Sequence, residues 1–154
     1  MIAEDILFAS IGELSRLIKR RQVTPVRLTG AYLDRIEKLS PRLNAFVTVT
    51  ADLAMKQAAQ AEKEINAGLS RGPLHGIPFA AKDLFAVKGY PTTWGAHAYK
   101  EQVFEDDAAV IRKLRGAGAI LLGKCAMSEL AGGPPKASAT GACRRRSRGG
   151  ARMS

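Results

Sequence analysis

The fold is decided by the run GPLHGIPFAAKDLF at positions 72–85 together with a second apolar run, ILLG, at positions 120–123. Within the first run, residues 77–81 (IPFAA) are short and continuously apolar, which predicts a buried strand, and residues 120–123 predict another. Between them, Asp107 is expected to cap a helix over residues 108–117. A strand, a crossover helix and a second strand predict two parallel strands in an α/β sheet.

The beginning of the chain predicts a pair of amphipathic helices. Ser10 and Glu13 have the spacing of a capping box, and apolar residues recur on one helical face over residues 11–21. A second helix is expected to start at Thr24-Pro25, with the threonine as N-cap and the proline at the first helical position. The pair Ser40-Pro41 is expected to end this helix.

Two further elements are predicted between the helical pair and the run at positions 72–85. Residues 44–49 (NAFVTV) are apolar and β-branched, which favours a strand. Residues 51–67 are rich in alanine and predict a helix that Gly68 closes. The sequence therefore predicts an α/β fold in which a helical pair is followed by the first part of a mixed, largely parallel sheet.

The composition is that of a globular domain up to residue 133 and changes after it. Of 154 residues, 46% are hydrophobic and 25% are charged, and the formal net charge is +10. Residues 134–154 hold six basic residues and no acidic one, without hydrophobic periodicity, so we expect a domain over 1–133 and a basic, disordered tail over 134–154. Arg-, Ala- and Gly-rich sequence is also typical of a GC-rich gene read out of frame. We therefore expect a frameshift between Gly133 and Arg144.

Four motifs resemble the amidase signature family in order and spacing: residues 72–85, Thr92-Thr93-Trp94-Gly95, Asp107-Ala-Ala-Val, and GAILLGKCAMSEL at positions 118–130. The resemblance also extends over residues 11–67. It implies the first part of a large α/β domain that hydrolyses amides through a nucleophilic serine, a second serine on a cis peptide bond, and a lysine. General amidases and the A subunit of glutamyl-tRNA(Gln) amidotransferase are relatives of this kind, and the motifs do not choose between them.

Lys82 matches the lysine of the family and is the candidate catalytic residue. A lysine acts as a general base only when it is neutral, which requires desolvation that lowers its pKa from about 10.4 toward neutrality. We expect the apolar residues near Lys82 to supply that surrounding; they are Ile77, Phe79, Ala80, Ala81, Leu84 and Phe85. In the family, the lysine takes a proton from the nucleophile through the second serine, and backbone amides hold the oxyanion.

The serine motifs of the family, Gly-Gly-Ser-Ser and Gly-Ser-x-Thr-Gly-Gly-Ser, have no counterpart in these 154 residues. Ser138, Ser147 and Ser154 stand in another context, so neither serine is assigned and no substrate-binding residue is named. We therefore expect the chain by itself to be inactive. The alternative is a non-catalytic, truncated protein whose arginine-rich tail binds nucleic acid or anionic surfaces, or one that folds poorly because half a sheet leaves an open edge.

The remaining polar residues predict no second site. His75 and His97 lack a partner at ligand or catalytic spacing, and Cys125 and Cys143 fit no metal or disulfide framework, so no metal and no cofactor are expected. The tail has no aromatic residue to stack on a base, which disfavours a nucleic-acid partner. A small-molecule amide is the expected substrate, in a cytoplasmic protein without a membrane segment. The oligomeric state is left open.

Overall fold

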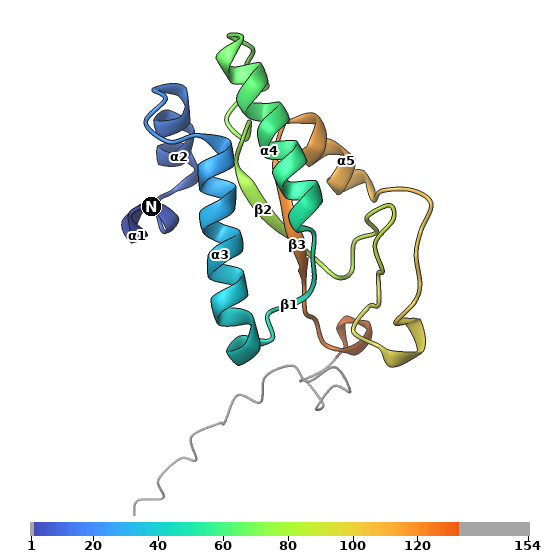
Figure 1. Cartoon of the computed structure of the whole chain (residues 1–154). Coiled ribbons are helices and arrows are strands. Elements are labelled where there is room, and N and C mark those ends of the chain that lie inside the picture. The colour runs from blue at the N-terminus through green and yellow to red at the C-terminus, as the bar shows by residue number, and fades with distance from the viewer. Residues whose placement is uncertain (1, 133–154) are drawn as a thin grey trace, which may run out of the picture.

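The computed structural model describes residues 2–132 and has helices packed on both faces of a small mixed sheet (Figure 1). The predicted tail, residues 134–154, and the predicted frameshift therefore lie outside the described residues, as do Ser138, Cys143, Ser147 and Ser154. Among residues 2–132, no helix has the length and apolarity needed to cross a membrane. The elements are α1 (Glu4–Leu7), α2 (Ile11–Lys19), α3 (Pro25–Leu43), β1 (Phe46–Val49), α4 (Ala51–Asn66), β2 (Pro78–Lys82), the 3₁₀ helix η1 (His97–Tyr99), α5 (Ala109–Gly116), β3 (Ile120–Cys125) and the 3₁₀ helix η2 (Glu129–Ala131).

The sheet has the order β1-β3-β2, so β3 is the central strand of the part that the structure describes. β2 and β3 are parallel, as predicted, and Pro78 lies opposite Ile120 while Lys82 lies opposite Cys125. β1 is antiparallel to β3, with Phe46 opposite Cys125, which makes the sheet mixed. No described strand pairs with the outer edge of β2.

The side chains of β3 alternate between two cores, as the pleat of a strand requires. Ile120 and Leu122 pack against Ala54 and Ala58 of α4 on one face. Leu121 faces the other side, where it packs with Ile111 of α5 and with Ala81 and Val87. Figure 1 shows α3 and α4 side by side on the first face, with α5 on the opposite one. Every residue from Ile120 to Lys124 is buried as a result.

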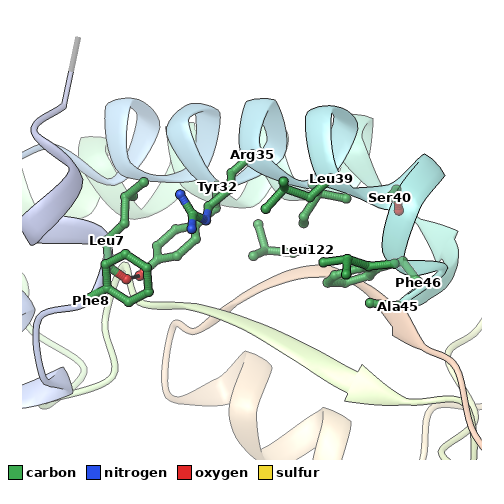
Figure 2. A pocket seen from close by; sticks show the side chains of 11 residues that line it. Leu7, Phe8, Tyr32, Arg35, Leu39, Ser40, Ala45, Phe46 and Leu122 are labelled. Carbon is green, nitrogen blue, oxygen red and sulfur yellow. Dashed lines mark hydrogen bonds between the residues drawn. The ribbon is translucent and has the colours of Figure 1, made fainter. Parts of the chain in front are cut away.

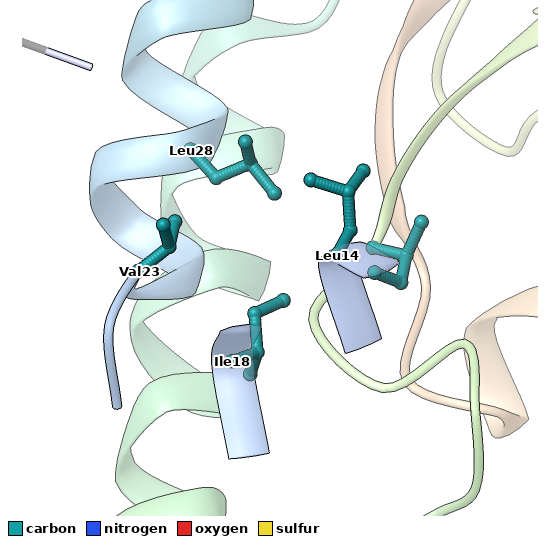
Figure 3. Packing of buried hydrophobic residues seen from close by; sticks show 5 residues of the cluster. Leu14, Ile18, Val23 and Leu28 are labelled. Carbon is teal, nitrogen blue, oxygen red and sulfur yellow. The ribbon is translucent and has the colours of Figure 1, made fainter. Parts of the chain in front are cut away.

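A third core lies between α2, α3 and the start of β2 (Figure 3). Leu14 and Ile18 of α2 meet Leu28 of α3 there, together with Val23 and Ile77. The predicted capping box fixes the start of α2, because the Ser10 amide donates to Glu13 Oε2 at 2.8 Å and the Glu13 amide donates to Ser10 Oγ at 3.3 Å. Capping and amphipathic periodicity together place the apolar face of α2 toward the sheet.

Two predicted helix boundaries were wrong. α3 continues through Pro41 to Leu43, because a proline in the last turn forfeits only its own backbone hydrogen bond; Asn44, at φ 47°, ends the helix instead. Asp107 does not cap α5. Its carboxylate accepts from the Lys88 amide at 2.8 Å and pairs with Arg115 at 2.6 Å, so α5 begins at Ala109 after an N-cap alanine without a side-chain bond.

A partly buried ionic cluster closes the end of the sheet where β2 and β3 begin. The Arg71 guanidinium contacts both oxygens of the Glu64 carboxylate, at 2.7 and 2.5 Å, and Gln60 donates to the same carboxylate at 2.8 Å. His75 Nε2 lies 3.1 Å from Glu64 Oε2, while His75 Nδ1 accepts from the Arg71 amide. The bonds from Arg71 and Gln60 lower the pKa of Glu64 from 4.5 to about 2, and burial lowers the pKa of His75.

Replacing Leu28 with alanine tests the third core. Leu28 is completely buried, so its truncation should lower the free energy of unfolding by about 2–5 kcal/mol through lost burial and a residual cavity. Urea unfolding followed by circular dichroism measures the change. The matched control is Leu69→Ala at a 60% exposed leucine, which should change stability by less than about 0.5 kcal/mol. Equal effects of the two substitutions would contradict the packing described here.

Replacing Glu64 with glutamine tests the ionic cluster through pH. The pKa of Glu64 is lower in the folded chain than in the unfolded one, so its contribution is present above pH 4.5 and is lost as the pH falls toward 2. The unfolding free energy of Glu64→Gln should therefore fall less steeply over that interval than that of the wild type. Glu105→Gln, at an exposed carboxylate, serves as the control. If the unfolding free energies of the wild type and Glu64→Gln changed in parallel with pH, protonation of Glu64 would not contribute to the pH dependence of stability.

Candidate functional site

The candidate site lies where the parallel strands β2 and β3 end. Lys82 is the last residue of β2, and its register partner Cys125 is the last residue of β3. Asp83 follows directly and extends the ladder, since its amide donates to the Cys125 carbonyl at 3.0 Å. The carboxyl ends of parallel strands are where open α/β sheets place their ligands. The structure thus brings Lys82, Asp83 and the end of β3 together.

Lys82 is exposed, so the neighbouring apolar residues do not by themselves withdraw it from water. Of those residues, Ile77 and Ala81 are buried, but Leu84 and Phe85 are exposed to 46% and 37%. The reason is the position of β2: it is an edge strand among the described residues, so no other described strand packs beside its final residues on that side.

The buried lysine of the site is Lys124, which sequence reasoning missed. Its side chain and that of Asp83 are 0% and 1% exposed, and Lys124 Nζ lies 2.7 Å from Asp83 Oδ1. Lys124 Nζ also donates to the Pro91 carbonyl at 2.5 Å and to Thr92 Oγ1 at 2.6 Å. An ammonium has three N–H donors, and here three oxygens surround it. Burial lowers the pKa of Lys124, and the Asp83 carboxylate opposes this shift.

The second oxygen of Asp83 holds the turn at residues 92–95. Asp83 Oδ2 accepts from the Thr93 amide at 3.0 Å and from Thr93 Oγ1 at 2.5 Å. Thr93 Oγ1 in turn accepts from the Gly95 amide at 3.1 Å. The anchor of this turn is therefore the carboxylate beside Lys82.

A sequence signal for this pair existed. Lys124 interrupts the apolar run of β3, and a charge inside a buried strand requires a partner of opposite sign. Asp83, at the end of the parallel neighbour of β3, is the acid that the topology places closest. The predicted β2–β3 pairing would have been enough to connect the two residues.

The histidines and the described cysteine do not form a second catalytic centre. His75 is buried in the Glu64 cluster at the opposite end of β2 and β3, and His97 is exposed at the start of η1. Cys125 is half-buried, and burial raises the pKa of its thiol while the charge of Lys82 lowers it. Cys125 is also the register partner of Lys82 in the parallel strand pair.

An apolar groove of about 270 Å³ lies elsewhere, between α1, α3 and the sheet (Figure 2). Leu122 of β3 and Phe46 of β1 lie on one side of it and Leu39 of α3 on the other, as Figure 2 shows. Phe8, 71% exposed, stands beside it under the guanidinium of Arg35, whose carbon is 5.0 Å from the ring centre. Lys82, Asp83 and Lys124 do not line this groove, so it is separate from the candidate site.

Comparison with known proteins connects this arrangement to a family. The family model described as Amidase matches residues 27–141. The glutamyl-tRNA(Gln) amidotransferase A subunit of Methylococcus capsulatus is 42% identical over 124 residues, which are 80% of this chain and 25% of that protein. The corresponding protein of an Azoarcus species is 45% identical over 125 residues, covering 81% of this chain and 26% of that one. This chain thus spans about a quarter of the length of these relatives.

Solved structures agree with the sequence relatives. Native peptide amidase from Stenotrophomonas maltophilia superposes with a TM-score of 0.74 at 38% identity, over 79% of this chain and 25% of that one. A bacterial aryl acylamidase described as an amidase signature enzyme gives a TM-score of 0.75 at 32% identity, over 84% and 27%. The predicted resemblance and the predicted fold class are both confirmed. From the parallel strand pair, the motifs along it and these matches, it follows that the chain belongs to the amidase signature family.

Proposed function

We propose that this chain supplies the general base, Lys82, of an enzyme that hydrolyses the C–N bond of a carboxamide. The observation that carries the proposal is the position of Lys82: it is the exposed lysine at the carboxyl end of β2, within the motif that the family membership rests on. Lys124 is the other lysine of the site, but it is buried and committed to three oxygens, so it has no lone pair to offer a substrate.

The proposed reaction follows the mechanism that the resemblance implies. A serine hydroxyl attacks the amide carbonyl while its proton passes through a second serine to the neutral amine of Lys82. The C–N bond breaks and the leaving amine takes up a proton; water then releases the acid from the serine ester. The relatives named above differ in what they act on, and an amide bond is the chemistry that their names share.

Hydrolysis also needs groups that residues 1–154 do not provide. The two serine motifs have no counterpart in this sequence, and Lys82 lies open to water, whereas a neutral lysine base requires a desolvated site. We therefore propose that the serines and the cover over Lys82 come from protein that corresponds to the remaining three quarters of the relatives. By itself, the 154-residue chain should release no ammonia from simple carboxamides even at high protein concentration.

A hybrid enzyme tests the proposal directly. Residues 27–132 of this chain replace the aligned segment of Stenotrophomonas maltophilia peptide amidase, and ammonia release from simple carboxamides is measured. Lys82→Ala in the hybrid should lower kcat by at least about 100-fold, because a general base contributes about 10²–10⁴-fold. Lys88→Ala, at an exposed lysine beyond β2, is the matched control. Undiminished turnover of a folded Lys82→Ala hybrid would rule Lys82 out as the base.

The thiol of Cys125 reports where the Lys82 ammonium lies. Burial raises the pKa of this thiol above 9.0 and the positive charge of Lys82 opposes the shift, so Lys82→Gln should raise the pKa further. The measurement is the rate of iodoacetamide alkylation against pH in a Cys143→Ser background, with Lys88→Gln as the control. If Lys82→Gln did not change the pH profile of alkylation, the Lys82 ammonium would point away from the end of β3.

A further inference from the structure

The ion pair between Lys124 and Asp83 joins three separate segments at the site. Asp83 follows β2, Lys124 belongs to β3, and the Pro91 carbonyl and Thr92 Oγ1 belong to the loop between these strands. Both charged side chains and Thr92 are withdrawn from water, since Asp83, Thr92 and Lys124 are each 0% exposed. The donors of Lys124 therefore determine where each segment lies.

The loop that this pair holds contains an uncommon backbone conformation. Trp94 has φ 50°, a left-handed conformation that is uncommon for a large side chain. Gly95 follows at φ 70°, and a Cβ there would lie 2.6 Å from the Met127 carbonyl oxygen, so only glycine fits so close to the segment after β3. The Trp94 carbonyl accepts from the Leu130 amide at 2.8 Å, which links the turn to η2.

The charged groups make directional hydrogen bonds, which an apolar pair could not make. Burying an ion pair costs desolvation that its attraction only partly repays, so an apolar pair of similar volume would hold the strands about as well. What the apolar pair would lack is the two hydrogen bonds from Lys124 Nζ to Pro91 and Thr92, and the two that Asp83 Oδ2 accepts from Thr93. Those bonds join the segment next to Lys82 to the segment next to Trp94.

We propose that Lys124 and Asp83 are positioning residues of the amidase site, which fix the Lys82 end of β2 and the Trp94 turn relative to each other. The inference rests on the proposed function for the role of Lys82, and it adds a second lysine with a different task. Lys82 meets the substrate side of the site, whereas Lys124 acts through Asp83 and the turn. A displacement of the Trp94 turn should therefore displace Lys82 as well.

Trp94 is the only tryptophan of the chain, so its fluorescence reports the turn selectively. In the full 154-residue chain, Lys124→Met removes the ammonium and nearly keeps the length of the side chain. Trp94 is half-buried, and its emission should shift to longer wavelength as the turn is released into water. Amide hydrogen exchange, followed by mass spectrometry, should become faster in residues 78–85 and 91–96 together. Unchanged emission and unchanged exchange in a folded Lys124→Met chain would overturn the proposal.

Two further variants separate positioning from stability. Thr93→Val removes the hydroxyl that bonds Asp83 Oδ2 but leaves no buried charge unpaired, and it should shift the Trp94 emission in the same direction. If Lys124→Met yields no folded protein, Thr93→Val decides, and an unshifted spectrum would overturn the proposal. The matched control is Glu64→Gln, which breaks the ionic cluster at the opposite end of the strands. It should lower stability without moving the Trp94 emission, and an equal shift there would reduce the effect to general loosening and overturn the proposal.

The same variants in the hybrid enzyme distinguish this proposal from the proposed function. Thr93→Val there should lower kcat more than it raises KM, because a misplaced base slows the chemical step. If Lys82→Ala leaves the hybrid active while Trp94 still responds to Lys124→Met, the function assigned to Lys82 fails and the linkage of the two segments stands. If Lys82→Ala abolishes turnover while Thr93→Val changes neither the Trp94 emission nor kcat, Lys82 is established as the base and the positioning role fails.

Discussion

The pairing of Asp83 with Lys124 is the constraint on which the rest of the site depends. Two charges are completely withdrawn from water, which costs several kcal/mol for each ion before their partners compensate. Compensation requires that the end of β2, the penultimate residue of β3 and the loop at Pro91–Thr92 all converge on one point. The strand register, with Lys82 opposite Cys125, places Asp83 and Lys124 where this convergence is possible.

Local chemistry made much of the fold predictable. The capping box at Ser10, the Thr24-Pro25 helix start and the parallel pair of apolar strands are encoded within a few residues each, and the structure confirms them. The two errors at helix boundaries have different causes. Asp107 could cap a helix, but Lys88 and Arg115 bind its carboxylate instead. Pro41 could end a helix, yet near the last turn its missing N–H matters little.

The candidate site shows the same division between local and distant information. The motif identified Lys82 as a candidate, but whether a lysine is buried depends on what packs beside its strand, and that is set by sheet order. Sheet order places Lys82 on an edge strand and Lys124 on the central strand, so Lys82 is exposed and Lys124 is buried. Burial of a charged residue is a tertiary property, and it could be predicted only by asking which acid lies near Lys124.

The same sheet order explains the apolar surface beside the site. Leu84 and Phe85 follow the edge strand β2, and they are exposed although their side chains are apolar.

The central position of β3 also determines the order in which this region can fold during synthesis. β1 and β2 each pair with β3 and not with each other, and the bond from Thr50 Oγ1 to the Leu121 carbonyl spans 71 positions. While the ribosome has yet to release β3, neither earlier strand has a ladder partner among residues 2–132, although α2, α3 and α4 have all been made. Non-local pairing of this kind slows folding, and chains emerge at about 5–20 residues per second. The apolar segments of β1 and β2 are therefore available to chaperones for several seconds before their partner exists.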